Sequence, residues 1–143
     1  MFDGHQSKIR SSTDDGATWT PFCDAPAGVI SEMNNLFSID NKLYCCGQNG
    51  FFELHSGGTT PLFSSPSKST ITNCFDAEIH NSNMYLSFSN DVKFSIDNGA
   101  SWTSVSSGLK ISSGNVGRIN CLTSFQGNLY AGTYYGGLFK LIE

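Results

Sequence analysis

Apolar and polar residues alternate in short runs along this chain, and turn-forming residues separate the runs. Three segments share the order of strand, polar turn and strand, and each ends on a tyrosine: 36–44, 77–85 and 123–130. Alternation with a period of two predicts half-buried β-strands. No segment carries apolar residues at a convincing helical spacing. We therefore expect an all-β fold.

The three segments repeat at the interval of a larger unit. Their tyrosines, Tyr44, Tyr85 and Tyr130, are separated by 41 and 45 residues. After each tyrosine the chain continues through a short strand, a turn and a further strand, and Asn-Gly at 49–50 and Gly-Gly at 136–137 are typical of hairpins. Repeats of about 40 to 50 residues are typical of β-propeller blades. The sequence thus predicts blades of four antiparallel strands.

An eight-residue pattern occurs twice. Residues 12–19 read Ser-Thr-Asp-Asp-Gly-Ala-Thr-Trp and residues 95–102 read Ser-Ile-Asp-Asn-Gly-Ala-Ser-Trp, so both fit S-x-D-x-G-x-[ST]-W. In such a turn the Asp carboxylate can accept hydrogen bonds from nearby amides, and Gly can take a positive φ. The hydroxyl groups can bond to the same turn, and the indole offers an apolar surface to a neighbouring unit. The pattern predicts a braced hairpin turn.

This pattern resembles the Asp-box, or BNR repeat, of sialidase-like β-propellers. The resemblance implies a turn between the third and the outermost strand of a blade, with an Asp that is structural. Trp19 and Trp102 are 83 residues apart, the length of two blades, and the blade between them has 56–60 as a simpler turn. The structural residues implied are Ser12, Asp14, Gly16, Thr18 and Trp19, and then Ser95, Asp97, Gly99, Ser101 and Trp102.

The number of blades is too small for one closed ring. We predict a single propeller domain over 1–143, with a half blade at 1–30, blades at 31–66 and 70–110, and a half blade at 117–143. At about 42 residues per blade the chain holds roughly 3.4 blades, and closed propellers have about 4 to 8. An open array exposes apolar faces and strand edges. We expect a homo-oligomer, with a dimer of about six blades favoured, or else completion by missing sequence or a capping partner chain.

The resemblance to sialidases raises the question of catalysis. A sialidase site needs an arginine triad for the substrate carboxylate, a Tyr nucleophile with a Glu partner, and an Asp acid. The chain has two arginines, Arg10 and Arg118, and neither lies in a recognisable clamp motif. Two-carboxylate glycosidases are a broader class, for which the candidates are Asp76 and Glu78, on one strand face, and then Glu53 and Glu32. Solvated or cross-strand polar residues are the favoured interpretation, so no catalytic residue is predicted.

Charge and hydropathy exclude other classes. The net charge is −4 and the eight basic residues are scattered, so no basic stripe suits nucleic acid. No apolar run approaches the roughly 18 residues of a membrane span, and the first residues show no signal-peptide core. The five cysteines, Cys23, Cys45, Cys46, Cys74 and Cys121, lack zinc-site spacing. No metal or cofactor is predicted.

The cysteines are expected to be free thiols. Cys74 and Cys121 each follow an Asn in the first strand of successive blades, which predicts equivalent core positions. Free thiols weakly favour a reducing compartment, whereas Asp-box propellers are often extracellular, so the localisation stays open. The phenylalanines of the later strands are also expected in the core: Phe51, Phe52, Phe88, Phe94 and Phe139.

A binding surface is the remaining candidate site. Sugar sites combine an aromatic plate with hydrogen-bonding groups, and Tyr134 and Tyr135 stand at a hairpin turn. Gln48, Asn49 and Asn90 occupy the corresponding turns of the other blades. Packing between blades is the competing interpretation of the tyrosines. We predict a non-catalytic binding or assembly module with a glycan as the leading ligand; a glycoside hydrolase fragment and a structural viral or appendage subunit are the alternatives.

Overall fold

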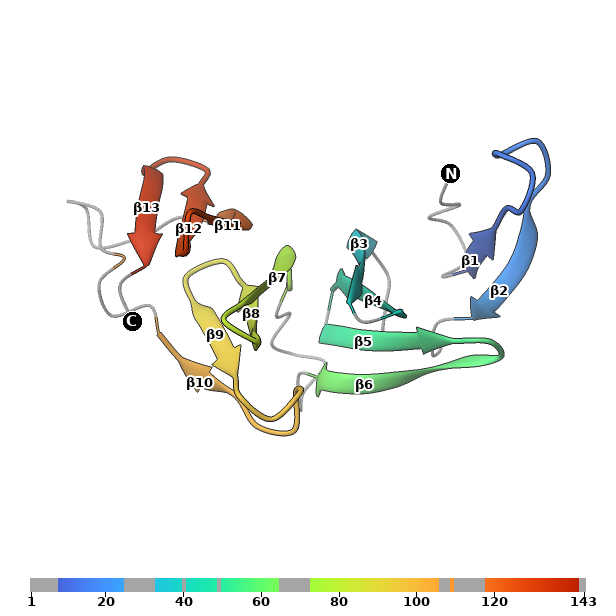
Figure 1. The fold of residues 1–143 in the computed structure, drawn as a ribbon, viewed down its shortest axis with the longest axis horizontal. Coiled ribbons are helices and arrows are strands. Elements are labelled where there is room, and N and C mark those ends of the chain that lie inside the picture. Colours follow the sequence, from blue (N-terminus) through green and yellow to red (C-terminus); the bar gives the residue numbers. More distant parts are fainter. Residues whose placement is uncertain are drawn as a thin grey trace. The chain divides into compact units, whose positions relative to one another are not determined.

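The described part of this protein has β-strands as its regular structure. The computed structural model describes residues 8–24, 33–39, 41–48, 50–64, 73–105, 109 and 118–141, and for 61–64 the backbone alone. Within these ranges, strands β1 to β13 form four antiparallel sheets (Figure 1). The all-β prediction is confirmed. The chain divides into two compact units, Met1–Ile71 and Thr72–Glu143, each with two sheets.

The Met1–Ile71 unit holds a two-stranded and a four-stranded sheet. The first pairs β1 with β2, and the second has the order β3-β4-β5-β6. Consecutive strands are neighbours throughout, as expected for strands joined by short turns. The strands are β1 (Lys8–Ser11), β2 (Thr20–Asp24), β3 (Met33–Ile39), β4 (Lys42–Gly47), β5 (Gly50–His55) and β6 (Gly58–Ser64).

Both faces of the four-stranded sheet carry buried side chains. One face contributes Cys45, Phe52 and Leu54 to a cluster with Ile9 and Cys23 of the neighbouring sheet. On the other face, the rings of Phe37, Tyr44 and Phe51 stack with centroids 5.4 to 6.1 Å apart. Because successive residues of a strand point to opposite faces, the adjacent Cys45 and Cys46 are both buried on different sides.

The Thr72–Glu143 unit holds a four-stranded and a three-stranded sheet. Their orders are β10-β9-β8-β7 and β11-β12-β13, and β11 lies against β7 and β8. The strands are β7 (Asp76–His80), β8 (Asn83–Ser87), β9 (Val92–Ser95), β10 (Thr103–Ser104), β11 (Ile119–Phe125), β12 (Asn128–Thr133) and β13 (Gly137–Leu141).

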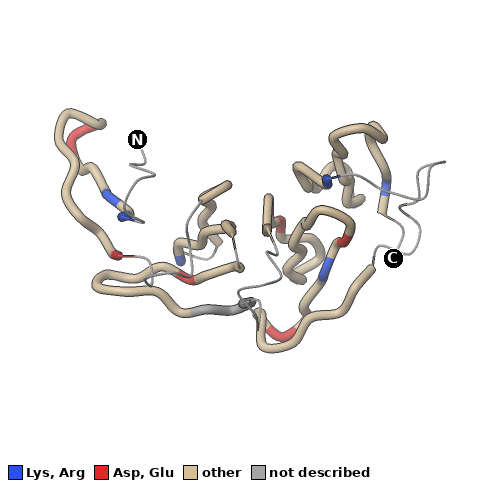
Figure 2. Tube along the Cα trace, turned by 180° about the vertical axis from the view of Figure 1, so that it is seen from behind, with Lys and Arg blue, Asp and Glu red and all other residues tan. Residues whose placement is uncertain are grey.

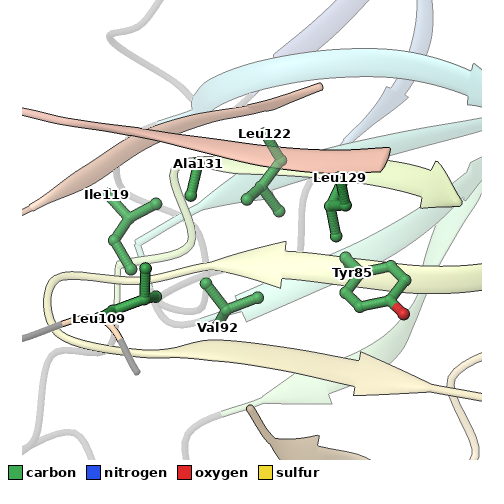
Figure 3. Packing of buried hydrophobic residues seen from close by; sticks show 7 residues of the cluster. All are labelled: Tyr85, Val92, Leu109, Ile119, Leu122, Leu129 and Ala131. Atoms are coloured by element: carbon green, nitrogen blue, oxygen red, sulfur yellow. The ribbon is translucent and has the colours of Figure 1, made fainter. Parts of the chain in front are cut away.

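The core of this unit fills the space between its two sheets. Figure 3 shows Tyr85 and Val92 of one sheet facing Ile119, Leu122, Leu129 and Ala131 of the other, with Leu109 at the margin. Phe94 and Phe139 pack against this cluster. Phe51, Phe52 and Phe88 are buried as well, so the expected core phenylalanines are confirmed.

The predicted strand–turn–strand segments correspond to β3-β4, β7-β8 and β11-β12. Their turns contain left-handed residues: Asn41 at φ 61°, Asn81 and Ser82 at 48° and 65°, and Gln126 and Gly127 at 49° and 71°. Asn and Gly tolerate this region better than other residues, which explains the polar break in each segment. Each of these three segments lies in a different sheet, whereas the number of blades, their boundaries and a closed ring stay predictions.

The thiols are free, and one prediction about them is wrong. Cys23, Cys45, Cys46 and Cys74 are buried, and burial raises the pKa of the Cys45 thiol to about 12. Cys121 is exposed instead of occupying a core position equivalent to that of Cys74. The register between β11 and β12 shifts between Ile119 and Cys121, and such an irregularity re-aims the side chain that follows it.

Candidate functional site

The two copies of the repeated pattern adopt one hydrogen-bonded turn. In the first, Asp14 Oδ1 accepts hydrogen bonds from Thr18 N at 2.8 Å and Ser12 Oγ at 2.7 Å, and Oδ2 accepts one from Thr18 Oγ1 at 2.5 Å. Asp97 accepts the same three bonds from Ser101 and Ser95, at the same distances. The turns join β1 to β2 and β9 to β10. Each carboxylate is thus used within its own turn.

Glycine and tryptophan complete each turn. Gly16 and Gly99 have φ angles of 88° and 90°, and their carbonyls accept the indole N–H of Trp19 and Trp102 at 3.1 Å. A Cβ on Gly16 would lie 3.8 Å from the ring of Trp19. The Trp19 indole therefore packs on its own turn.

The bonds to the aspartates change their acidity. The Thr18 hydroxyl is the main cause in the first turn, where the pKa of Asp14 is lowered to about 2. The Ser101 hydroxyl is the main cause in the second turn, where the pKa of Asp97 is lowered to about 2. Hydrogen bonds to the ionised form favour that form. At neutral pH both carboxylates are ionised acceptors that brace a turn.

Asp76 and Glu78, the candidate glycosidase pair, contact the next sheet. Asp76 Oδ2 accepts a hydrogen bond from Leu122 N at 2.8 Å, and Glu78 Oε1 accepts one from Ser124 N at 3.0 Å. Glu53 pairs with Lys42 at 3.2 Å, and Glu32 lies outside the described residues. The structure therefore gives these three carboxylates partners within the protein.

The β12-β13 turn presents two exposed tyrosines. Tyr134 is 59% exposed and Tyr135 is 81% exposed, and their rings meet edge to face with centroids 4.5 Å apart. Thr133 Oγ1 accepts a hydrogen bond from Gly136 N at 2.9 Å and donates one to Gly137 O at 3.1 Å. Tyr134 N donates to Arg118 O at 2.8 Å. The turn is held from both sides while its rings face solvent.

Arg118 lies beside these tyrosines. Its guanidinium carbon is 4.7 Å from the ring centroid of Phe75 and 5.6 Å from that of Tyr134, and its Nε donates to Asn120 Oδ1 at 2.5 Å. Lys42 forms an ion pair with Glu53 and Lys93 forms one with Asp91, and neither pair involves Arg118. Figure 2 shows the Lys and Arg residues spaced apart along the trace. Sequence reasoning gave Arg118 no role, because its contacts come from distant segments.

The other predicted binding residues are separated. Asn90 is exposed in the β8-β9 turn, which Phe88 N closes on Asp91 O at 2.9 Å, and Ile119 N bonds to Phe88 O at 3.2 Å. This links Asn90's turn to the start of β11, next to Arg118. Gln48 is half-buried in the other unit, and Asn49 lies outside the described residues.

Neither a metal-binding cluster nor a helix suited to cross a membrane occurs in the described residues. No group of three or more His, Cys, Asp or Glu side chains is arranged there to hold a metal ion. Nor do those residues include a helix of the length and apolarity that crossing a membrane requires.

Comparison with known proteins gives similarity of fold. No protein-family model and no curated protein matches the chain. The chain is similar to the extracellular domain of the putative hybrid two component system BT4673 from B. thetaiotaomicron, with a TM-score of 0.70 and 13% identity over 96% of this chain and 19% of that one. It is also similar to the computationally designed Ika4 protein, with a TM-score of 0.50 and 10% identity over 76% of this chain and 64% of that one. This chain spans about a fifth of the first structure, and the likeness concerns the fold alone.

Proposed function

We propose that this chain is a non-catalytic binding module built from Asp-box propeller blades, with a glycan as its ligand. The observation that carries the proposal is the exposed Tyr134–Tyr135 pair on a turn held by Thr133 and by the Arg118 carbonyl. Aromatic rings that are fixed but open to solvent offer apolar plates to the apolar face of a sugar, and nearby hydroxyl and guanidinium groups supply hydrogen bonds.

The absence of catalysis is part of the proposal. Asp14 and Asp97 brace their turns, and Asp76 and Glu78 accept backbone hydrogen bonds from β11. A glycosidase needs two carboxylates that face a scissile bond. Arg10 and Arg118 belong to different units, and Arg118 has aromatic neighbours within its own unit. These features support binding in preference to hydrolysis.

The test of glycan binding is a glycan array probed with the wild-type chain and with two variants, Tyr134→Ala and Tyr135→Ala. Each variant should weaken binding about two- to twelvefold, since an aromatic contact is worth about 0.5 to 1.5 kcal/mol. Phe125→Ala is the matched control, because Phe125 is 60% exposed at the other end of β11 and β12. Failure to bind any glycan, or equal losses in all three variants, would reject the proposal.

We further propose that the ring is completed by self-association, or by sequence outside this chain. The described part has two strands in the first sheet and three in the last, where the middle sheets have four. A turn with the same hydrogen bonds joins β9 to β10 and β1 to β2. Because β9 and β10 are the third and fourth strands of their sheet, β1 and β2 correspond to the third and fourth strands of a blade. The first and last sheets therefore supply between them every strand of one blade, with the third present twice.

Light scattering tests the self-association. Two copies would give about six blades, which lies within the usual range for closed propellers. The expected mass is twice the 15.5 kDa of one chain. A mass of 15.5 kDa across the concentration range would exclude the dimer.

A further inference from the structure

Asn98 and Gly99 form an Asn-Gly pair within the turn that joins β9 to β10. Such a pair is open to spontaneous deamidation, because glycine has no side chain to hinder attack by its backbone nitrogen on the preceding amide. The attack requires that the N–H of Gly99 is free and that the side chain of Asn98 can reach it. Asn98 is exposed, whereas Gly99 is buried. The structure of the turn therefore decides whether the pair reacts.

The attacking nitrogen is already engaged in the folded protein. Ser95 Oγ accepts a hydrogen bond from Gly99 N at 2.8 Å and one from Asp97 N at 3.3 Å, and it donates its own hydrogen to Asp97 Oδ1 at 2.7 Å. A hydroxyl has one hydrogen and two lone pairs, so every site of this group is used. Ser95 is 2% exposed, which keeps water from taking its place. A buried hydroxyl thus holds the nitrogen that deamidation needs.

We propose that Asn98 is a deamidation site that Ser95 keeps closed in the folded protein. When the turn opens, Gly99 N gives its proton to water or hydroxide and bonds to Cγ of Asn98, and the Nδ2 group takes up a proton and leaves as ammonia. Water then adds to one carbonyl carbon of the succinimide ring and breaks its bond to nitrogen. The product is aspartate or isoaspartate at this position. This inference goes beyond the proposed function and does not depend on glycan binding.

The first turn shows which product the fold accommodates. Asp15 stands where Asn98 stands in the second turn, and their φ angles are 55° and 56°. Gly16 N donates to Ser12 Oγ at 2.8 Å, as Gly99 N does in the second turn. An aspartate product therefore fits the turn. Isoaspartate lengthens the backbone by one carbon before Gly99, so we expect this product to separate Gly99 N from its acceptor and open the turn.

The experiment compares the whole chain in buffer at neutral pH with the same chain unfolded in guanidinium chloride at that pH. Mass spectrometry of the peptides follows the replacement of NH₂ by OH at Asn98. The Asn49-Gly50 pair of the unfolded chain is the internal reference, since it has the same two residues. Asn98 should react at least about tenfold more slowly in the folded chain, because several hydrogen bonds must open first. Equal rates in the two states would overturn the proposal.

Two variants separate the role of Ser95 from general loosening of the turn. Ser95→Ala removes the acceptor of Gly99 N and should raise the folded-state rate at least about fivefold. Ser101→Ala is the matched control, because it removes a hydroxyl bond to Asp97 Oδ2 and leaves the bond from Gly99 N in place. Its rate should rise less. Equal acceleration in both variants, or none in Ser95→Ala, would overturn the role of Ser95.

Amide hydrogen exchange of the wild-type protein tests the same role without a variant, and so it decides the question even if Ser95→Ala does not fold. Exchange at Gly99 N requires the same opening of its bond to Ser95. In urea below the unfolding transition, the exchange rate at Gly99 and the deamidation rate at Asn98 should rise in parallel. Rapid deamidation while the Gly99 amide stays protected would show that Ser95 does not control the reaction.

Discussion

Asp76 and Leu122 connect the two sheets of the Thr72–Glu143 unit: the side-chain Oδ2 of Asp76, on β7, accepts the backbone N–H of Leu122, on β11, at 2.8 Å. β11 is the edge strand of its sheet, so the N–H groups that face away from β12 need other partners. Glu78 supplies the next one by accepting Ser124 N at 3.0 Å. Two carboxylates thus take the place of a neighbouring strand, and they also block the addition of another one.

Asp76→Ala should destabilise this unit by about 1 to 3 kcal/mol, because it leaves the half-buried N–H of Leu122 without its acceptor. Asp76→Asn keeps an acceptor oxygen and should restore most of the stability. Urea unfolding of the two variants measures the difference. Asp24→Ala, at an exposed carboxylate of β2, is the control. An Asp76→Ala protein as stable as this control would show that the bond contributes nothing.

The hydrogen bonds within the two turns predict that Asp14 and Asp97 titrate at a lower pH than ordinary aspartates. The folded pKa of Asp14 and of Asp97 is about 2, below the ordinary value of 3.8, so the ionised form stabilises the turn. That contribution is complete at neutral pH and begins to fall near pH 4. It is lost as the pH drops through about 2. Carboxyl carbon shifts followed by NMR should give both midpoints near 2.

Ser101→Ala tests whether the Ser101 hydroxyl causes the low pKa of Asp97. The Ser101 hydroxyl is the largest contributor to the low pKa of Asp97, so its removal should raise that pKa toward 3.8. Asp14, braced by Thr18 in the other copy, should titrate unchanged within the same sample. If the Asp97 midpoint does not move, the hydroxyl is not the cause.

The strands and turns could be predicted because the same short sequence patterns recur along the chain. Polar breaks after Ile39, His80 and Phe125 mark left-handed turns, and alternation around them predicts antiparallel strands. The repeated pattern likewise predicts amide bonds to Asp14 and Asp97, which the structure contains. These features depend on residues within a few positions of each other, so the sequence alone displays them.

The candidate site was only half predictable. Tyr134 and Tyr135 stand out because two aromatic residues beside Gly-Gly occupy a hairpin turn. Arg118 does not stand out, because its ring neighbours come from other segments: Phe75 precedes β7 and Tyr134 lies in the β12-β13 turn. The packing of β11 against β7 brings in Phe75, and the pairing of β11 with β12 brings in Tyr134. The prediction of a core position for Cys121 was wrong for a similar reason: a register shift in strand pairing reverses which side its thiol faces.

Gly132 and Cys121 provide a test of that register. They are paired across β12 and β11, and a Cβ on Gly132 would lie 2.6 Å from Cys121 Sγ. Gly132→Ala should therefore force the exposed Cys121 thiol to rotate away from the new Cβ, at a cost of about 1 kcal/mol or less. Cys121→Ala should relieve most of this cost in the double variant while changing little alone. Denaturant unfolding of the four proteins gives the coupling energy. Additive effects would contradict the close contact.

His80 provides the last prediction, about the position of a proton. Its ring is buried, with Nδ1 at 3.0 Å from Ser124 Oγ and Nε2 at 3.1 Å from Asn81 Nδ2. The hydroxyl of Ser124 donates its single hydrogen to Ile79 O at 3.2 Å, so it can only accept from His80. Nδ1 must then carry the proton, and Nε2 must accept from the Asn81 amide. Nitrogen shifts of the imidazole should identify the tautomer that carries its proton on Nδ1.

Ser124→Ala should disturb that tautomer, because it removes the hydroxyl that accepts the Nδ1–H of His80. We expect a shift of the population toward the Nε2–H tautomer and a loss of about 1 to 3 kcal/mol of stability. Thr123→Ala is the matched control, since this exposed neighbour on β11 points to the other face of the strand. An Nε2–H tautomer in the wild-type protein would mean that the hydroxyl of Ser124 donates to His80 and not to Ile79, and that β7 and β11 are joined by one bond fewer.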